Sequence, residues 1–291
     1  MSQTVRRPHI CVIGGGSAGL SVAAGAQQMG ADVVLIEAGK MGGDCLNYGC
    51  VPSKAILAAA KSAKAVKKAP EFGVQAELKG VDFMAVHNHI HSVIGKIEPH
   101  DSVERFEGLG LKVIQERGHF VDADTVQAGD TLIKPKRIVV ATGSSAFVPP
   151  IPGLDEVPFL TNETLFEQTQ TPEHLIILGG GPIGCEMAQA HVNLGAQVTQ
   201  IEMGTIMPKD DPDAVAVIRE SLIEDGINLL EKAKAVKVEK TDTGLAVTVE
   251  QDGQEKRIEG SHLLIATGRV PNLAGLNLEA ASIDYDRRGI K

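Results

Sequence analysis

The stretch HICVIGGGSAGLSVAAGAQQMGADVVLIEAG, residues 9–39, decides the fold. It begins with a short apolar run and continues into a turn whose glycines are Gly14, Gly16 and Gly19. A run of small residues then has the composition of a helix that stops at Gly30, and the apolar segment VVLIE ends on Glu37. This order predicts a strand, a tight turn, a helix and a second, parallel strand.

This combination of glycines and a terminal acid has the chemistry of a dinucleotide site. Glycine lets the backbone approach a pyrophosphate at the positive N-terminus of the following helix. A carboxylate at the end of the second strand accepts hydrogen bonds from ribose hydroxyls. Glu37 has that position, so the segment is predicted to bind a nucleotide cofactor.

The same pattern occurs a second time in HLIILGGGPIGCEMAQAHVNLGAQVTQIEMG, residues 174–204, with the same internal spacing. Its turn contains Gly179, Gly181 and Gly184, and its acid is Glu202. One glycine motif also occurs in ordinary tight turns, but two copies in matching context strongly favour two nucleotide sites. No arginine follows Glu202 closely to hold a 2′-phosphate, which favours NADH over NADPH at this site.

Each half of the chain closes on an apolar strand followed by Ala-Thr-Gly, in RIVVATGSS (137–145) and HLLIATGRVPN (262–272). These motifs add candidate cofactor-binding residues: Ala141, Thr142, Gly143 and Gly268. The proline- and glycine-rich stretch SAFVPPIPGLDEVP predicts a junction near residue 155. We expect an α/β fold of two doubly wound, Rossmann-like domains over 1–155 and 156–272, with 273–291 returning to the first.

The segment LAVTVEQDGQEKRIEG, residues 245–260, alternates apolar and polar residues around Asp252 and Gly253. An Asp-Gly pair between alternating runs is typical of a two-residue hairpin turn. It predicts a β-hairpin or meander inserted in the second domain.

The stretch GGDCLNYGCVPSK, residues 42–54, places two of the four cysteines five positions apart. On a regular helix their Cα atoms would lie about 8 to 9 Å apart, beyond the reach of a disulfide, so either the backbone is distorted or no disulfide forms. Because Cys45 and Cys50 follow the first nucleotide motif directly, we expect a redox pair near a cofactor, with Lys54 and a helix start favouring a thiolate. A zinc site or incidental buried thiols are the alternatives, and no further ligands stand at zinc-like spacing.

Composition narrows the class of partner. The net charge of −9 and the pI near 5.5 argue against nucleic acid or an anionic membrane. The polar start MSQTVRRPH leads into a short apolar run, so we expect no signal peptide, no membrane anchor and a cytoplasmic location. His87 and His91 share a helix face, but no carboxylate or cysteine stands at a fitting position, so we predict no metal site.

Together, the two glycine motifs, the two ATG motifs and GGDCLNYGCVPSK resemble the pyridine nucleotide-disulfide oxidoreductase family, which includes dihydrolipoamide dehydrogenase, glutathione reductase and mercuric reductase. The resemblance implies FAD on the first domain, NAD(P)H on the second and hydride transfer through the flavin to the disulfide. It further implies that Cys45 is the interchange thiol and Cys50 the thiolate against the flavin, that Lys54 and Glu186 pair near the flavin ring, and that Arg269 lies beside the cofactor.

Within the family, VPSK after the second cysteine resembles dihydrolipoamide dehydrogenase first and mercuric reductase second, which implies NAD(H) and a disulfide or dithiol partner such as lipoamide. The chain departs from the usual pattern at Asp44, Tyr48 and Pro182. Members continue after ATGRVPN into a further FAD-binding strand and a dimerisation domain with a catalytic His-Glu pair. We therefore expect a truncated chain with doubtful full turnover, whose full-length form is a homodimer.

Overall fold

The computed structural model describes residues 4–291 as two compact units, each discontinuous in sequence. Unit 1 comprises Met1–Val51, Val93–Ser145 and Arg269–Lys291, and unit 2 comprises Pro52–Ser92 and Ala146–Gly268. Residues 1–3 of the polar N-terminal stretch lie outside the described residues. The two units are defined by contacts between residues. The boundaries at residues 155 and 272 were predicted for cofactor-binding domains, and they stay a prediction.

The centre of unit 1 is a four-stranded parallel sheet in the order β4-β3-β2-β8. Its strands are β2 (Ile10–Ile13), β3 (Val33–Ile36), β4 (Lys112–Ile114) and β8 (Arg137–Val140). Strand β2 leads through the first glycine turn into α1 (Ser17–Gln28), and α1 leads to the parallel strand β3. The strand-turn-helix-strand unit predicted over residues 9–39 is confirmed.

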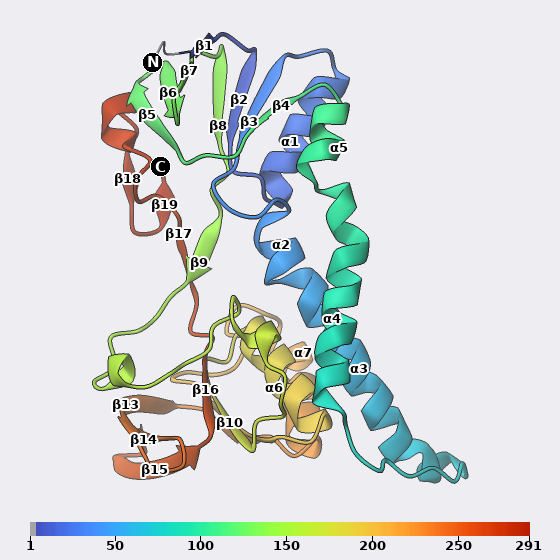
Figure 1. Cartoon of the computed structure of the whole chain (residues 1–291). Coiled ribbons are helices and arrows are strands. Elements are labelled where there is room, and N and C mark those ends of the chain that lie inside the picture. The colour runs from blue at the N-terminus through green and yellow to red at the C-terminus, as the bar shows by residue number, and fades with distance from the viewer. Residues whose placement is uncertain (1–3) are drawn as a thin grey trace. The chain divides into compact units, whose positions relative to one another are not determined.

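Both faces of this sheet are buried, which is why its strands are almost continuously apolar. On one face, Cys11 and Ile13 pack with a second sheet in the order β1-β7-β6-β5, made of β1 (Thr4–Arg6), β5 (Gly118–Asp122), β6 (Thr125–Ala128) and β7 (Thr131–Ile133). On the other, Val12 packs with Leu20 of α1 and Phe106 of α5 (Val103–Gly108). Figure 1 shows these layers around β2 and β8.

Unit 2 has the same strand-turn-helix-strand arrangement. Its parallel sheet has the order β12-β11-β10-β16, made of β10 (His174–Leu178), β11 (Gln197–Ile201), β12 (Asn228–Leu230) and β16 (His262–Ile265). Helix α6 (Pro182–Asn193) joins β10 to β11, and α7 (Pro212–Glu224) precedes β12. Two Rossmann-like units in one chain confirm the predicted fold class.

The predicted hairpin is present as β14 (Leu245–Gln251) and β15 (Gln254–Gly260), which pair antiparallel. Asp252 and Gly253 both have positive φ, 53° and 75°, which matches the right-handed strand twist of a two-residue turn. Strand β13 (Ala233–Lys240) pairs on the other side of β14, so the insertion is a three-stranded meander. Its apolar face packs on the parallel sheet of unit 2 through residues such as Val247 and Ile176.

The remaining elements connect these layers. The helices are α2 (Gly43–Asn47), α3 (Cys50–Lys68) and α4 (Phe83–Ile97), with 3-10 turns at η1 (Ala69–Phe72), η2 (Glu98–His100), η3 (Leu154–Glu156), η4 (Leu165–Glu167) and η5 (Leu278–Ala281). Strands β9 (Ser144–Ala146) and β17 (Arg269–Pro271) pair, as do β18 (Tyr285–Asp286) and β19 (Gly289–Ile290). Among residues 4–291, every helix is too short or too polar to span a membrane.

A buried carboxylate ties three helices of unit 2 together. Asp225, at the end of α7, has a side chain that is 5% exposed and accepts hydrogen bonds from Lys64 of α3 at 2.7 Å and from Gln189 and Asn193 of α6 at 3.0 and 3.1 Å. Burial opposes its ionisation, but these hydrogen bonds hold the pKa of the Asp225 carboxyl below its usual value. The basic run at residues 61–70 therefore serves partly for packing.

We expect Asp225→Ala to lower the free energy of unfolding by about 2 to 4 kcal/mol at pH 7, because the substitution leaves the Lys64 ammonium without its partner. Since the folded pKa is depressed, the ionised carboxylate stabilises fully above the usual value of 3.8 and loses this contribution as the pH falls through the lower folded value. Urea unfolding between about pH 2.5 and pH 7, a range that includes the usual pKa of an aspartate, measures this effect. The free energies of unfolding of the two proteins should converge as the pH falls. The control is the exposed neighbour Glu224→Ala, and an equal loss in it would contradict this account.

Candidate functional site

The first glycine turn is fixed by close backbone contacts. Gly14 has φ of 114°, and a Cβ there would lie 2.2 Å from the carbonyl oxygen of Ala141. A Cβ on Gly19 would lie 1.8 Å from the carbonyl oxygen of Gly14. Both positions therefore require glycine, because these distances are far inside van der Waals contact.

The second turn reproduces these contacts. Gly179 has φ of 118°, and a Cβ there would lie 2.3 Å from the carbonyl oxygen of Ala266, while a Cβ on Gly184 would lie 2.2 Å from that of Gly179. Ala266 belongs to the second ATG motif, as Ala141 belongs to the first. The repeat seen in the sequence is thus a repeat of backbone packing, in which each ATG segment supports its own glycine turn.

The middle glycines are different, and they test whether the turns fit a dinucleotide. A Cβ on Gly181 would meet nothing within 4 Å, and one on Gly16 would meet only the Gly43 Cα at an ordinary 3.7 Å. Packing does not require glycine at either position, but a pyrophosphate that approaches the backbone there does. Gly16 and Gly181 are also the N-caps of α1 and α6, and neither helix has a side-chain cap. The two turns therefore fit an anionic ligand.

The two acids are held in equivalent places. Glu37 accepts hydrogen bonds from the backbone N–H of Gly15 at 2.5 Å and of Gly39 at 2.6 Å. Glu202 accepts them from Gly180 at 2.6 Å and from Gly204 at 2.7 Å. Each half-buried carboxylate is thus positioned beside its glycine turn, where the sequence analysis placed an acceptor for ribose hydroxyls.

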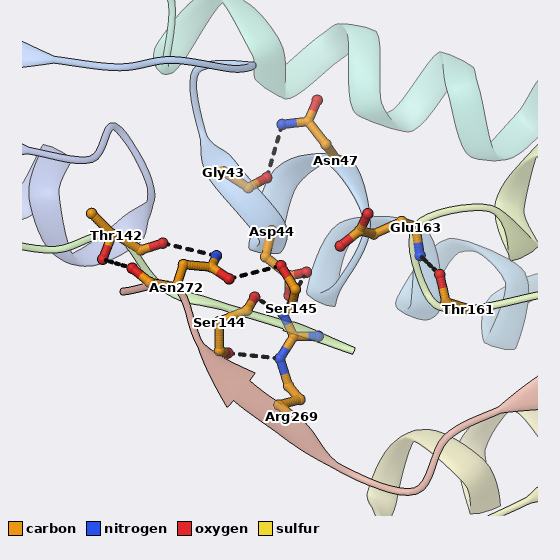
Figure 2. A network of polar contacts seen from close by, with 10 residues as sticks. All are labelled: Gly43, Asp44, Asn47, Thr142, Ser144, Ser145, Thr161, Glu163, Arg269 and Asn272. Atoms are coloured by element: carbon orange, nitrogen blue, oxygen red, sulfur yellow. Dashed lines mark hydrogen bonds and ion pairs between the residues drawn. The ribbon is translucent and has the colours of Figure 1, made fainter. Parts of the chain in front are cut away.

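The first ATG segment is held by a residue that the sequence analysis missed. Asn272 donates its side-chain N–H to the carbonyl oxygen of Thr142 at 3.1 Å, and its own carbonyl accepts the Thr142 hydroxyl at 2.7 Å (Figure 2). Its backbone N–H donates to the carbonyl of Gly143, whose φ is 68°. The signal available in the sequence was only the Asn at the end of ATGRVPN. In the second motif, the Thr267 hydroxyl donates to Phe147 O at 2.9 Å, and Gly268 has φ of 142°.

The cysteine pair lies where two helices meet at a backbone break. Cys45 is in the short helix α2 and Cys50 is the first residue of α3, with Tyr48 at φ −139° between them. A hydrogen bond joins the two cysteine side chains, which are not linked by a disulfide. The regular helix that would keep the cysteines apart is therefore absent, and the sulfurs are neighbours.

The pair is attached to the first nucleotide motif. Gly42 and Gly16 form an isolated parallel bridge, and a Cβ on Gly43 would lie 2.6 Å from the Gly16 Cα. Cys45 also has a side-chain hydrogen bond with Ser17, at the start of α1. Position 43 must therefore be glycine for the two segments to approach so closely.

The electrostatics of the two thiols differ. Burial raises the pKa of the Cys45 thiol, and a hydrogen bond and charge repulsion from Cys50 raise it further, against lowering contributions from Ser17 and from the Cys50 backbone. Negative charge is thus disfavoured on Cys45. The other cysteines are inert by comparison: burial raises the pKa of Cys11 to about 12 and also raises that of Cys185.

Lys54 and Glu186 are brought together within unit 2. The Lys54 Nζ lies 2.6 Å from the Glu186 Oε1, across 132 positions of sequence. The side chains are 62% and 34% exposed, and such an open pair contributes little to stability by itself.

Arg269 lies in a polar network with Asp44, one of the departures from the family pattern. Its Nη2 donates to Asp44 Oδ1 at 3.0 Å and to the carbonyl of Ser144, and its Nε donates to the Ser144 hydroxyl at 2.8 Å (Figure 2). Its Nη1 is buried and has no hydrogen-bond partner among residues 4–291. The acid at position 44 thus balances the charge of Arg269 beside Cys45, an arrangement that no spacing in the sequence reveals.

The other two departures also have local roles. Pro182 is the first residue of α6, where its fixed φ suits a helix start and its missing N–H costs nothing. The Tyr48 ring lies 5.5 Å from the Lys40 ammonium, and its backbone ends α2.

Comparison with known proteins gives a consistent result. The family model for pyridine nucleotide-disulphide oxidoreductases matches residues 8–291. The chain is 34% identical over 281 residues to a mercuric reductase of Staphylococcus aureus and 35% identical over 289 residues to a dihydrolipoyl dehydrogenase of Acholeplasma laidlawii. These alignments cover 96% and 97% of this chain, and 51% and 84% of the relatives.

Among solved structures, the HOCl-induced flavoprotein disulfide reductase RclA from Escherichia coli, in a Cu(II) complex, superposes with a TM-score of 0.81 at 27% identity. The match covers 96% of this chain and 60% of that one. The chain spans about half the length of the first mercuric reductases it matches, 51% and 44%.

Proposed function

Because the chain belongs to the pyridine nucleotide-disulphide oxidoreductase family, we propose that it passes electrons between NAD(H), FAD and a disulfide formed by Cys45 and Cys50. Proteins of this family use FAD and NAD(P)H, and relatives of this chain are named mercuric reductase, dihydrolipoyl dehydrogenase and flavoprotein disulfide reductase.

Each glycine turn is proposed to bind a different nucleotide. In the proposal, Gly16 and the N–H groups at the start of α1 hold the FAD pyrophosphate, and Glu37 accepts its ribose hydroxyls. Gly181, the start of α6 and Glu202 do the same for NADH. Bound FAD would supply the chemistry that the side chains lack, because it accepts a hydride and releases the electron pair to a disulfide.

The two cysteines are proposed to have different roles in disulfide exchange. Reduction breaks one S–S bond, takes two electrons and two protons and gives two thiols. Cys50, at the start of α3, is proposed to carry the thiolate on the cofactor side, while Cys45 exchanges with the substrate disulfide. The raised pKa of Cys45 keeps that sulfur protonated when Cys50 carries the charge. Lys54 and Glu186 are proposed to hold a fixed ion pair at the flavin, and Arg269 to orient the loop through Asp44.

One observation carries this function: the Cys45 and Cys50 side chains are hydrogen-bonded to each other, and Cys45 is hydrogen-bonded to Ser17 of the first nucleotide motif. The test is the visible spectrum of the protein with FAD, before and after anaerobic NADH. We expect flavin bands that bleach and a long-wavelength band from a thiolate beside the flavin. A protein that does not retain FAD, or a flavin that NADH leaves oxidised, would refute the proposal.

For the substrate, we propose a small or protein-bound dithiol such as dihydrolipoamide, as in dihydrolipoyl dehydrogenases. Mercuric reductases among the relatives make Hg²⁺ reduction the second candidate. Lipoamide and Hg²⁺ assays of the full-length protein distinguish the two. The full-length form is proposed to be a cytoplasmic homodimer, which sedimentation and cell fractionation test.

The glycines of the second turn give a prediction that separates folding from binding. Gly184→Ala should cost about 1 to 3 kcal/mol of unfolding free energy, because its Cβ would overlap the Gly179 carbonyl. Gly181→Ala should change stability by less than about 0.5 kcal/mol, since its Cβ meets nothing and its φ of −73° suits alanine. Its methyl group should instead weaken NADH binding at least 10-fold, about the effect of 1.4 kcal/mol.

Urea unfolding and NADH titration of both variants check this prediction. Unchanged NADH affinity in Gly181→Ala would mean that the open face of the turn does not receive the pyrophosphate.

A further inference from the structure

Two histidines of unit 2 lie side by side on one face of α4. His87 and His91 are four positions apart, and their ring centroids are 4.2 Å apart with an interplanar angle of 48°. Residues at this spacing are neighbours on a helix surface. Both side chains are half-buried.

The 3-10 turn η4 supplies the carboxylate that the sequence analysis did not find. Glu167 is 76 positions after His91, yet its Oε2 lies 3.7 Å from the His91 Nε2. One nitrogen of each histidine and one oxygen of Glu167 all lie within 4.8 Å of one another. These three groups come from two separate segments of unit 2, α4 and η4.

An ordinary surface ion pair is a poor description of this cluster. The His91 Nε2 is inaccessible to solvent and has no hydrogen-bond partner among the described residues, because 3.7 Å to Glu167 is too long for one. A buried nitrogen lone pair facing a carboxylate and a second imidazole is what a metal ligand offers.

We propose that His87, His91 and Glu167 bind a divalent first-row transition metal, with zinc as the expected ion. Two imidazole nitrogens and one carboxylate oxygen are a known zinc donor set, whereas Ca²⁺ and Mg²⁺ prefer oxygen ligands alone. Water would fill the remaining position, since the Glu167 side chain is 61% exposed. Nδ1 of His87 lies 3.4 Å from the Asn88 Oδ1, which is the kind of outer contact that orients a ligating ring.

The site would join α4 to the 165–167 turn and stabilise unit 2. Tetrahedral ligands at about 2.1 Å from zinc are about 3.4 Å apart, so closure from the observed spacing requires shifts of about 1 Å in side chains that are partly exposed. Metal bound to the native state but not to the unfolded chain raises the melting temperature, and the rise grows with the logarithm of the free metal concentration above the dissociation constant. Zinc binding and thermal stability should therefore rise together.

The test measures Zn²⁺ binding by calorimetry in the full chain carrying Cys45→Ser and Cys50→Ser, which removes the competing thiolates. Zinc itself is the probe because it undergoes no redox reaction. We expect one ion per chain with a dissociation constant below about 10 µM, weaker than four-ligand structural sites, and a melting temperature that rises on addition of zinc.

In that background, His87→Ala, His91→Ala and Glu167→Gln should each weaken zinc binding by more than about 100-fold, because outer-shell partners alone are worth about 10 to 100-fold. The matched control is His89→Ala, an exposed histidine of the same helix. It should leave both the affinity and the zinc-dependent rise in melting temperature unchanged.

Each variant is compared with its own metal-free melting temperature, so a change in intrinsic stability does not obscure the result. The proposal would be overturned if zinc showed no saturable one-to-one binding at concentrations up to about 0.1 mM, which is about tenfold above the expected dissociation constant. Binding that persists in His91→Ala, or that falls equally in His89→Ala, would also overturn it.

Discussion

Replacing Cys45 with serine should halve the NADH consumed on full anaerobic reduction of the FAD-loaded oxidised protein, from about two equivalents per flavin to about one, because a disulfide takes two electrons. The remaining equivalent reduces the flavin, because a serine hydroxyl at position 45 can still form the hydrogen bond to Ser17 at the start of α1. Reduction of an added disulfide should fall to the background rate, since the serine hydroxyl does not form or exchange a disulfide. Anaerobic titration followed by absorbance measures both quantities.

The control for this prediction is Cys11→Ala, which removes a buried sulfur of strand β2. This variant should still consume about two equivalents of NADH per flavin. Burial raises the pKa of the Cys11 thiol to about 12, so that thiol stays protonated and takes no part in disulfide exchange. If Cys45→Ser still consumes two equivalents, the second electron acceptor is not the Cys45–Cys50 disulfide.

Glu202→Ala should raise the NADH concentration needed for half-maximal flavin reduction by about 10- to 100-fold, since the carboxylate offers charged hydrogen bonds worth about 1.5 to 3 kcal/mol to the ribose hydroxyls. The loss includes the Gly180 and Gly204 contacts that hold the turn. The matched variant Glu37→Ala changes the equivalent acid of the first turn. It should release FAD and leave the NADH dependence of the FAD-loaded fraction unchanged.

Stopped-flow reduction over a range of NADH concentrations, together with the flavin content after dialysis, separates the two variants. An NADH dependence that shifts equally in both, or in neither, would mean that the two turns do not bind different nucleotides.

The repeated turns were predictable because their requirements are local. Gly14 and Gly19 must be glycine for reasons of backbone contact within one strand-turn-helix unit, and so must their counterparts Gly179 and Gly184. Local requirements of this kind leave a fixed spacing in the sequence. The hairpin at Asp252 and Gly253 was predictable for the same reason, since its turn needs two residues with positive φ.

The parts that the sequence could not predict depend on residues far apart. Asp44 and Arg269 are 225 positions apart, and Glu167 approaches His91 only because η4 and α4 fold together. No periodicity or motif connects these residues. The sequence predicts no metal site because Glu167 lies far from the two histidines along the chain, at no spacing typical of a metal ligand.

The basic run at residues 61–70 illustrates the same limit. Its composition indicates a solvated helix face, yet Lys64 reaches the buried Asp225 and Lys67 donates to the Asn193 carbonyl at 3.2 Å. A lysine that pairs with a buried acid looks like any exposed lysine in the sequence, because the partner lies on another helix.

The central claim is that electrons from NADH reach the Cys45–Cys50 disulfide, and counting thiols tests it most directly. The oxidised, FAD-loaded protein is treated anaerobically with NADH and then with a thiol-alkylating reagent under denaturing conditions, and labelled peptides are identified by mass spectrometry. The account predicts about two additional alkylated thiols per chain, both in the peptide that contains residues 42–54, because one disulfide yields two thiols. A reduced flavin with no new thiols at Cys45 and Cys50 would contradict it.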